Sequence, residues 1–199
     1  MELYDIAQEL AAEFENPILI GGIAAIESGY TAESTKDVDM IVVVHERYSA
    51  AQVLEDFTVT SQTPRGEKGR GIYCGIHVDV YFEHQSYLGS LAQLDVALIA
   101  QYRGKRVGNW ILLTPPAQFA TKVAALLDRA GTLKGRRDAN TLYAMILSSL
   151  SPEDAREAFL NCSSSSNRIQ LWEQACADLS SALSTNTERD TVRSFFRTR

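Results

Sequence analysis

The stretch DVDMIVVVH, residues 37–45, decides how the N-terminal half of the chain folds. Its β-branched residues follow one another closely, which is typical of a strand buried within a sheet. Asp37 and Asp39 stand at the start of this strand with one residue between them. Because successive side chains of a strand point to opposite faces, we expect both carboxylates to lie on the same face.

Further strands are predicted on both sides of this stretch. Residues 18–20 form a short apolar run that stops at Gly21 and Gly22, and the alanine-rich segment after the two glycines predicts a helix through residue 28. In residues 76–82, IHVDVYF, the apolar side chains share one face, and Asp79 shares the other face with His77 and Tyr81. The sequence therefore predicts a second strand with a carboxylate on its polar face.

The rest of the chain separates into a mixed part and a helical part. Before residue 115 we expect helices over 2–15 and 49–57, an edge strand and a polar Gly-rich loop within 58–75, and a strand over 110–113. After it, helical patterns cover 116–130, 136–149, 152–160, 168–183 and 187–197, and the serine cluster 161–167 predicts a flexible link. This order indicates an α+β fold: a small mixed β-sheet core with flanking helices, residues 1–114, followed by an all-helical C-terminal part, residues 115–199.

Composition excludes several classes of protein. The chain has 199 residues, of which 45% are hydrophobic and 22% charged, as in ordinary globular proteins rather than disordered or membrane proteins. The start of the chain lacks the features of a secretory signal and no stretch is long enough to span a membrane, so a cytoplasmic protein is expected. The net charge of −6 argues against a broad nucleic-acid-binding surface. Local basic segments remain at 65–70, 103–106 and 134–137, each predicted to be a loop or turn because each contains glycine.

Three carboxylates on neighbouring strands are suited to a hard divalent cation such as Mg²⁺ or Mn²⁺. Asp37 and Asp39 would supply two of them and Asp79 the third, while the Gly21–Gly22 turn offers backbone donors to phosphate oxygens. Each piece alone has a plainer interpretation, since two nearby aspartates can begin a strand and two glycines can simply form a turn. Their combination is what points to chemistry on phosphates.

The order of these motifs resembles the minimal nucleotidyltransferase superfamily related to DNA polymerase beta. The resemblance extends to residues 119–138, FATKVAALLDRAGTLKGRRD, which look like a segment of the AbiEii and MenT type toxin nucleotidyltransferases. That segment carries a Lys, an Arg about two turns later and an Asp at the start of the next helix, here Lys122, Arg129 and Asp138. The resemblance covers residues 17–150 and provides no specific motif for the last fifty.

The resemblance implies a nucleotidyltransferase core and a role for each motif. Asp37, Asp39 and Asp79 would hold the metal, Asp79 would help to deprotonate an acceptor hydroxyl, and Lys122 would bind the triphosphate of an NTP. The chain has Gly21–Gly22 where many superfamily members have Gly-Ser, and Ser34 or Thr35 could replace the missing hydroxyl. Arg129 shares a helical face with Lys122, and Asp138 would orient that lysine, although both could equally be ordinary surface charges.

Three hypotheses about function remain open at this point. The toxin branch implies RNA, the 3′ end of tRNA in particular, with an antitoxin protein as a partner. An aminoglycoside-like small molecule or a protein hydroxyl is the second alternative, and the acidic composition slightly favours a cationic acceptor. A catalytically silent module that binds nucleotide or a partner is the third.

Overall fold

The computed structural model describes residues 2–62 and 64–197, which divide into two compact units. The first unit comprises the chain up to residue 87 together with residues 95–114. The second comprises residues 88–94 and the chain from residue 115 onward. Residues 88–94, which the sequence analysis had placed with the core, therefore group with the C-terminal helices.

Within the described residues, the strands form one mixed sheet of eight, which confirms the α+β prediction. The strands lie in the order β3-β4-β5-β2-β1-β8-β7, and the short strand β6 pairs with β5. Strand β2 runs parallel to β5, and β1 runs parallel to β8, while the other pairs along this path are antiparallel. Their bounds are β1 Ile18–Ile20, β2 Asp37–Val42, β3 Glu55–Gln62, β4 Gly66–Tyr73, β5 Ile76–Leu88, β6 Leu94–Asp95, β7 Arg103–Val107 and β8 Trp110–Leu113.

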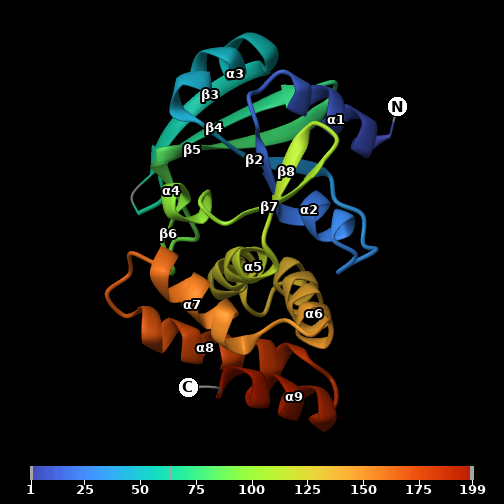
Figure 1. Cartoon of the computed structure of the whole chain (residues 1–199), viewed down its shortest axis with the longest axis vertical. Coiled ribbons are helices and arrows are strands. Elements are labelled where there is room, and N and C mark those ends of the chain that lie inside the picture. The colour runs from blue at the N-terminus through green and yellow to red at the C-terminus, as the bar shows by residue number, and fades with distance from the viewer. Residues whose placement is uncertain (1, 63, 198–199) are drawn as a thin grey trace. The chain divides into compact units, whose positions relative to one another are not determined.

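One face of this sheet carries the core of the first unit. Val38 and Met40 of β2 are fully buried there with Val80 of β5, and helices α1 and α3 contribute Leu10 and Ala50 to the same cluster (Figure 1). Because side chains alternate along β2 and β5, Asp37, Asp39 and Asp79 lie on the opposite face of the sheet. The helices of this unit are α1 Leu3–Ala12, α2 Gly21–Glu27, α3 Arg47–Val53 and α4 Val96–Ile99, with a 3₁₀ turn, η1, at Val44–Glu46.

The predicted Gly-rich loop is wrong, because residues 66–73 form strand β4. A Cβ atom at Gly69 would lie only 2.7 Å from the ring of Phe57 and 3.1 Å from that of Phe82, so glycine lets β4 pack closely on these aromatic rings. Lys68 and Arg70 alternate with Gly69 and occupy the other face. The segment therefore has the alternation of a strand, with glycine in place of the usual apolar side chains.

Two other local predictions are also wrong. Residues 103–106, expected to be a loop, belong to edge strand β7, and residues 134–137, expected to be a turn, lie inside the first turns of helix α6. Thr132 explains the second difference, because its hydroxyl accepts a hydrogen bond of 3.0 Å from the Gly135 amide and caps the helix. The helix expected over 49–57 ends at Val53, and β3 begins at Glu55.

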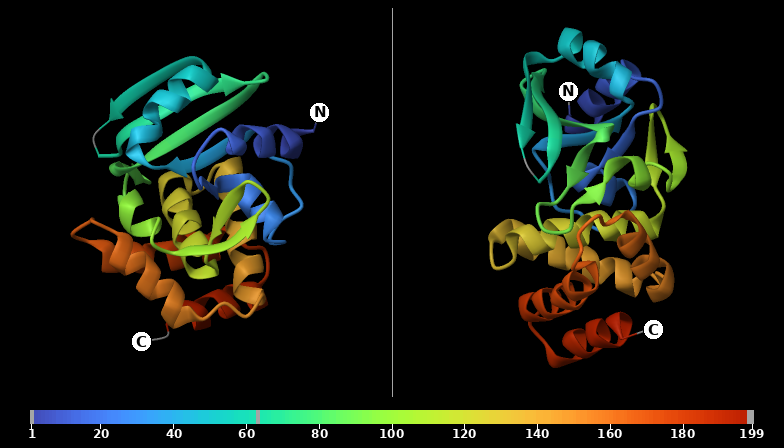
Figure 2. Two further views of the ribbon diagram at one scale, coloured as in Figure 1. Left: turned by 45° about the horizontal axis from the view of Figure 1, so that its top comes forward. Right: turned by 90° about the vertical axis from the view of Figure 1, so that its left-hand side faces the viewer.

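The second unit contains the helical part, as predicted. Its helices are α5 Pro115–Arg129, α6 Leu133–Leu147, α7 Pro152–Cys162, α8 Arg168–Ala182 and α9 Asn186–Phe196 (Figure 2). An aromatic cluster joins four of them, with ring centroids of Phe119 and Phe195 5.2 Å apart and those of Trp172 and Phe196 4.5 Å apart. Phe159 completes this cluster at 5.5 Å from Trp172. These rings are all buried, so they form the centre of the unit.

Residues 88–94 are held to the helices by polar contacts. Asp128 of α5 accepts hydrogen bonds of 2.8 and 3.0 Å from the Ser90 amide. The Ser163 side chain is buried, and its hydroxyl donates to the Ala92 carbonyl at 2.5 Å, while the Ser164 amide donates to the Gln93 carbonyl at 3.1 Å. The serine cluster after α7 thus includes positions with defined partners.

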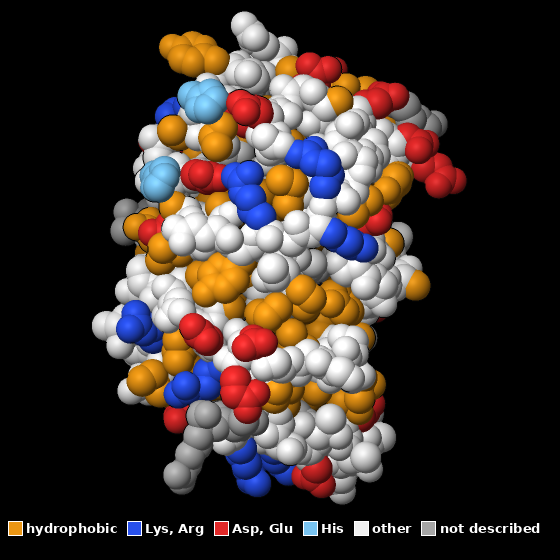
Figure 3. Space-filling view, viewed as in Figure 1, with side chains coloured by type: hydrophobic (Ala, Val, Ile, Leu, Met, Phe, Trp, Pro, Cys, Tyr) orange, Lys and Arg blue, Asp and Glu red, His pale blue; other side chains and the backbone are white. Residues whose placement is uncertain are grey.

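On the face of the molecule drawn in Figure 3, lysines and arginines and acidic residues stand in small separate groups among uncharged side chains. Over the described ranges, no helix has both the length and the apolar character needed to cross a membrane.

Candidate active site

The three predicted carboxylates come from adjacent parallel strands of the first unit. Asp39 of β2 is in register with Asp79 of β5, and Asp37 is in register with His77. Neighbouring strands lie roughly 4.8 Å apart, and paired residues point to the same face, so Asp39 and Asp79 stand side by side. Asp37 follows two residues away on that face. The geometry expected from the two separate sequence motifs is therefore present at the backbone level.

The Gly21 turn lies directly against this group. Gly21 has a φ of +73°, and a Cβ atom built on it would lie 3.0 Å from Cγ of Asp39 and nearer still to Oδ2. A Cβ atom on Gly22 would lie 2.7 Å from Cβ and Oγ1 of Thr35. Any side chain at Gly21 or Gly22 would collide with Asp39 or Thr35, so both positions need glycine. The turn therefore brings its backbone close to the Asp39 carboxylate. Ser34, the other predicted hydroxyl, is exposed.

Two cations from β4 hold Asp79. Arg70 Nε donates to Asp79 Oδ1 at 2.8 Å, and Arg70 Nη2 lies 3.2 Å from Oδ2. Lys68 Nζ forms a second ion pair with Oδ2. The register of the hairpin explains this arrangement, because Arg70 is the direct partner of Asp79 and Lys68 is the partner of the next residue on the same face, Tyr81.

These contacts set the protonation of the group. Burial alone would raise the pKa of Asp79, but the hydrogen bonds and charges of Arg70 and Lys68 outweigh it and hold the pKa below its ordinary value. Tyr81 lies next to the same carboxylates. Its burial, and then the negative charges of Asp39 and Asp79, raise its pKa, so the phenol stays protonated. Lys68 Nζ also lies 5.1 Å from the centre of the Tyr81 ring.

The donor chemistry of the aspartates can be compared with the needs of Mg²⁺. Mg²⁺ sites commonly use one or two carboxylates, with water and substrate phosphates as the other ligands, and Asp37 with Asp39 provides that set. Asp79 does not fit as a third ligand in this arrangement, because both of its oxygens contact cations. Accordingly, no group of three or more His, Cys, Asp or Glu side chains in the described part of the chain is arranged to hold a metal ion.

Lys68 and Arg70 are the two residues of this group that the sequence analysis did not assign to it. Their signal was the spacing Lys-Gly-Arg, which places both cations on one face of a strand. Because these residues were predicted to lie in a loop, the face to which their side chains point could not be predicted. His77 is also on this face and is exposed.

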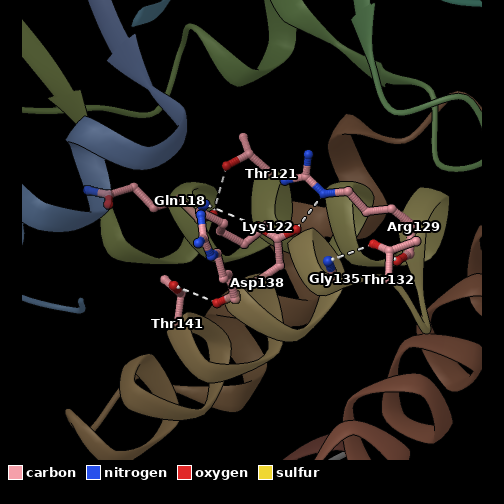
Figure 4. A network of polar contacts seen from close by, with 9 residues as sticks. Gln118, Thr121, Lys122, Arg129, Thr132, Gly135, Asp138 and Thr141 are labelled. Atoms are coloured by element: carbon pink, nitrogen blue, oxygen red, sulfur yellow. Dashed lines mark hydrogen bonds and ion pairs between the residues drawn. The ribbon is translucent and has the colours of Figure 1, made fainter. Parts of the chain in front are cut away.

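The remaining predicted residues form a separate cluster in the second unit (Figure 4). The side chain of Asp138 in α6 is only 3% exposed. Its Oδ1 forms an ion pair with Lys122 Nζ at 3.2 Å, and its Oδ2 forms one with Arg129 Nε at 2.6 Å. Lys122 and Arg129 lie two turns apart on α5, as expected, and share this one carboxylate. Lys122 and Asp138 therefore form an ion pair, and the role of Lys122 in binding a triphosphate stays a prediction. The structure brings these three residues together as one group and the three aspartates together as another.

Comparison with known proteins gives only distant similarities. No protein-family model matches the chain, and no curated protein sequence matches it. Among solved structures, an antigenic nucleotidyltransferase-like protein from Paracoccidioides brasiliensis is 16% identical with a TM-score of 0.45, and the match covers 94% of this chain and 95% of that chain. JHP933 from Helicobacter pylori is 8% identical with a TM-score of 0.48, covering 96% of this chain and 86% of that chain.

Proposed function

We propose that this protein is a metal-dependent nucleotidyltransferase, which moves a nucleotide from an NTP to an acceptor hydroxyl. The observation that carries the proposal is the register of β2 and β5, which sets Asp39 beside Asp79 with Asp37 on the same face. Carboxylates gathered on one face of a sheet repel one another. Lys68 and Arg70 offset this repulsion at Asp79, and a bound divalent ion would offset it at Asp37 and Asp39. The cluster is therefore suited to binding a divalent ion.

In this proposal Asp37 and Asp39 hold the divalent ion, Mg²⁺ or Mn²⁺. When bound, the ion neutralises phosphate charge and makes the acceptor hydroxyl a better nucleophile. The absence of a side chain at Gly21 leaves room for the Asp39 carboxylate beside the backbone of the turn. Larger residues at Gly21 would fill that space.

The ion pairs of Asp79 refine the role expected for it. A carboxylate with a lowered pKa is a weak base, so proton removal by Asp79 is disfavoured while Lys68 and Arg70 remain in place. We propose instead that Asp79 positions these two cations beside the metal-binding pair, where they contact phosphate oxygens. Asp79 joins the metal only if both ion pairs open.

The same cations bear on the identity of the acceptor. The Arg70 side chain is 63% exposed and Lys68 is 23% exposed, so positive charge is presented next to the carboxylates. Once a divalent ion offsets the charges of Asp37 and Asp39, a phosphate-bearing acceptor is attracted to these cations, whereas a cationic aminoglycoside is repelled. This favours RNA, and the 3′ end of tRNA is the acceptor we propose. A toxin role with an antitoxin partner follows from the resemblance of residues 119–138 alone.

Lys122 is proposed to bind phosphate of the NTP. It is held by Asp138 and shares that carboxylate with Arg129, so the two cations and one anion leave a net positive charge. A lysine fixed by a buried carboxylate loses less side-chain freedom on binding a phosphate than a free surface lysine would. Lys122→Met therefore weakens NTP binding in this proposal.

The direct experiment supplies the full chain with labelled NTPs, Mg²⁺ and total tRNA, and follows transfer of label to RNA. Wild type is expected to transfer label. Asp39→Asn is expected to lose at least about a hundredfold in rate, because even residues that only orient metal ligands contribute about 10–100-fold. Asp56→Asn is the matched control. Asp56 is exposed and has a φ of +51°, a conformation that asparagine also tolerates, so its activity should be unchanged.

Three outcomes would count against the proposal or its acceptor. Transfer by Asp39→Asn at the wild-type rate contradicts the assigned site. Transfer to kanamycin but not to tRNA shows that the acceptor is a small molecule. NTP binding by calorimetry without transfer to tRNA, aminoglycoside or protein shows a silent nucleotide-binding module.

A further inference from the structure

A separate cavity lies within the second unit, among helices α7, α8 and α9. Its volume is about 970 Å³, which is at the upper end of the range typical of ligand-binding sites. Its apolar wall includes Leu160 of α7, Ile169 and Trp172 of α8 and Phe196 of α9. Trp172 and Phe196 also belong to the aromatic cluster at the centre of the unit, so this wall rests on rigid, buried packing.

The charged residues around the cavity are mainly cationic. Arg156 of α7 and Arg189, Arg193 and Arg197 of the α9 region line it, against a single carboxylate, Glu173. Four arginines gathered here are unexpected in a chain with a net charge of −6. Guanidinium groups bind carboxylate, phosphate and sulfonate oxygens through pairs of parallel hydrogen bonds. The charge of the cavity therefore matches an anion.

Some of these cations already have structural contacts. Arg189 donates to the Leu183 carbonyl at 3.0 and 3.2 Å, and Arg193 pairs with Asp190 at 3.1 Å. The ion pair between Arg193 and Asp190 is solvent-exposed and joins residues one helical turn apart, so it contributes little to stability. Arg193 can therefore leave Asp190 and bind another anion. Arg193 is accordingly suited to binding, and Arg189 to holding the loop before α9.

Trp172 is the most deeply buried aromatic residue of the cavity wall. It is 4% exposed, and its indole N–H is buried without an acceptor among the residues that the structure describes. Such an unsatisfied donor costs about 1–3 kcal/mol.

We propose that this cavity binds a small anionic amphiphile, a molecule with one carboxylate, phosphate or sulfonate group and an aromatic or alkyl body. The anionic group lies among Arg156, Arg193 and Arg197, and the apolar body lies on Trp172 and Phe196. This site is independent of the aspartate cluster of the first unit and of the proposed nucleotidyl transfer.

The test uses two dyes that share a ring system and differ in charge. The anionic dye 1-anilinonaphthalene-8-sulfonate is expected to bind the full chain saturably, at one molecule per chain, and the uncharged N-phenyl-1-naphthylamine about tenfold more weakly or not at all. Dodecanoate should displace the anionic dye, and dodecanol should not. Equal binding of both dyes, or binding without saturation, would overturn the proposal.

Variants separate this cavity from general dye binding. Arg156→Gln with Arg193→Gln is expected to weaken binding at least about tenfold, whereas Arg136→Gln, an exposed arginine of α6 outside the cavity, is expected to have no effect. Ala177→Trp fills the cavity from an exposed position of α8 and should abolish binding with no change of charge. Circular dichroism confirms that each variant folds. Unchanged binding in the Arg156/Arg193 double variant, or displacement by a single-stranded oligonucleotide but not by dodecanoate, contradicts the proposal.

Discussion

Replacing Gly21 by alanine should damage both the stability of the first unit and the proposed activity. Gly21 has a φ of +73°, in the left-handed region that alanine rarely adopts. The new methyl group would also lie 3.0 Å from Cγ and 3.1 Å from Cβ of Asp39. The substitution therefore has two separable effects, one on the backbone and one on the carboxylate.

Gly29→Ala isolates the first effect. Gly29 has a φ of +77°, and no atom lies within 4 Å of the position its Cβ would occupy. Left-handed backbone costs a residue with a side chain about 1–2 kcal/mol, which both variants should lose. Crowding of a packed site typically adds about 1–3 kcal/mol, so Gly21→Ala should be destabilised by roughly 2–5 kcal/mol in total.

Urea unfolding measures both variants, and labelled-NTP transfer measures the site. Displacement of a catalytic group by about 1 Å can reduce a rate about a hundredfold, so Gly21→Ala is expected to lose at least that much activity while Gly29→Ala stays near wild type. The reasoning is refuted if both variants unfold at the same urea concentration and transfer label at the same rate.

Three other substitutions test the ion pairs and the helix cap. The folded-state pKa of Asp79 is lowered, so its ion pairs stabilise the protein above about pH 4 and this stabilisation is lost as the pH falls through the lowered pKa. Asp79→Asn should thus be less stable than wild type at pH 7 in urea unfolding, with a smaller difference at pH 3; an equal difference at both would argue against the ion pairs. Asp138→Asn removes a buried carboxylate from two cations and should cost about 3 kcal/mol, against under about 0.5 kcal/mol for the exposed Asp190→Asn. Thr132→Ala removes the cap of α6 and should cost about 1 kcal/mol by thermal unfolding, and a wild-type melting temperature would show that another group caps this helix.

Regular alternation made the central part of the fold predictable. Val38, Met40, Val78 and Val80 alternate with polar residues, and that period alone assigned the aspartates to one face of a sheet. The order of strands is not contained in such a pattern. Asp39 stands beside Asp79 because β2 pairs with β5 in parallel. The sequence pattern does not show which strands are neighbours, so it could not predict this contact.

Glycine misled the interpretation of local structure in all three basic segments, and the reason is clearest at Gly69 and Gly135. At Gly69 it fills a position where any side chain would meet Phe57, a contact set by the β3–β4 hairpin. At Gly135 it lies inside a helix, and a Cβ there would meet the backbone of Arg129 and Ala130. Both glycines are explained by neighbours in space, which a local pattern cannot show, and so Lys68 and Arg70 were missed.

The most direct test of the central claim is binding of Mn²⁺ in the presence of a non-hydrolysable NTP analogue, followed by electron paramagnetic resonance of the free ion. If Asp37 and Asp39 hold the metal, wild type should bind Mn²⁺ with the nucleotide, and Asp37→Asn and Asp39→Asn should each weaken that binding at least about tenfold. Asp79→Asn should retain it, because Asp79 is engaged with Lys68 and Arg70. Mn²⁺ binding that survives in Asp37→Asn and Asp39→Asn would contradict the account.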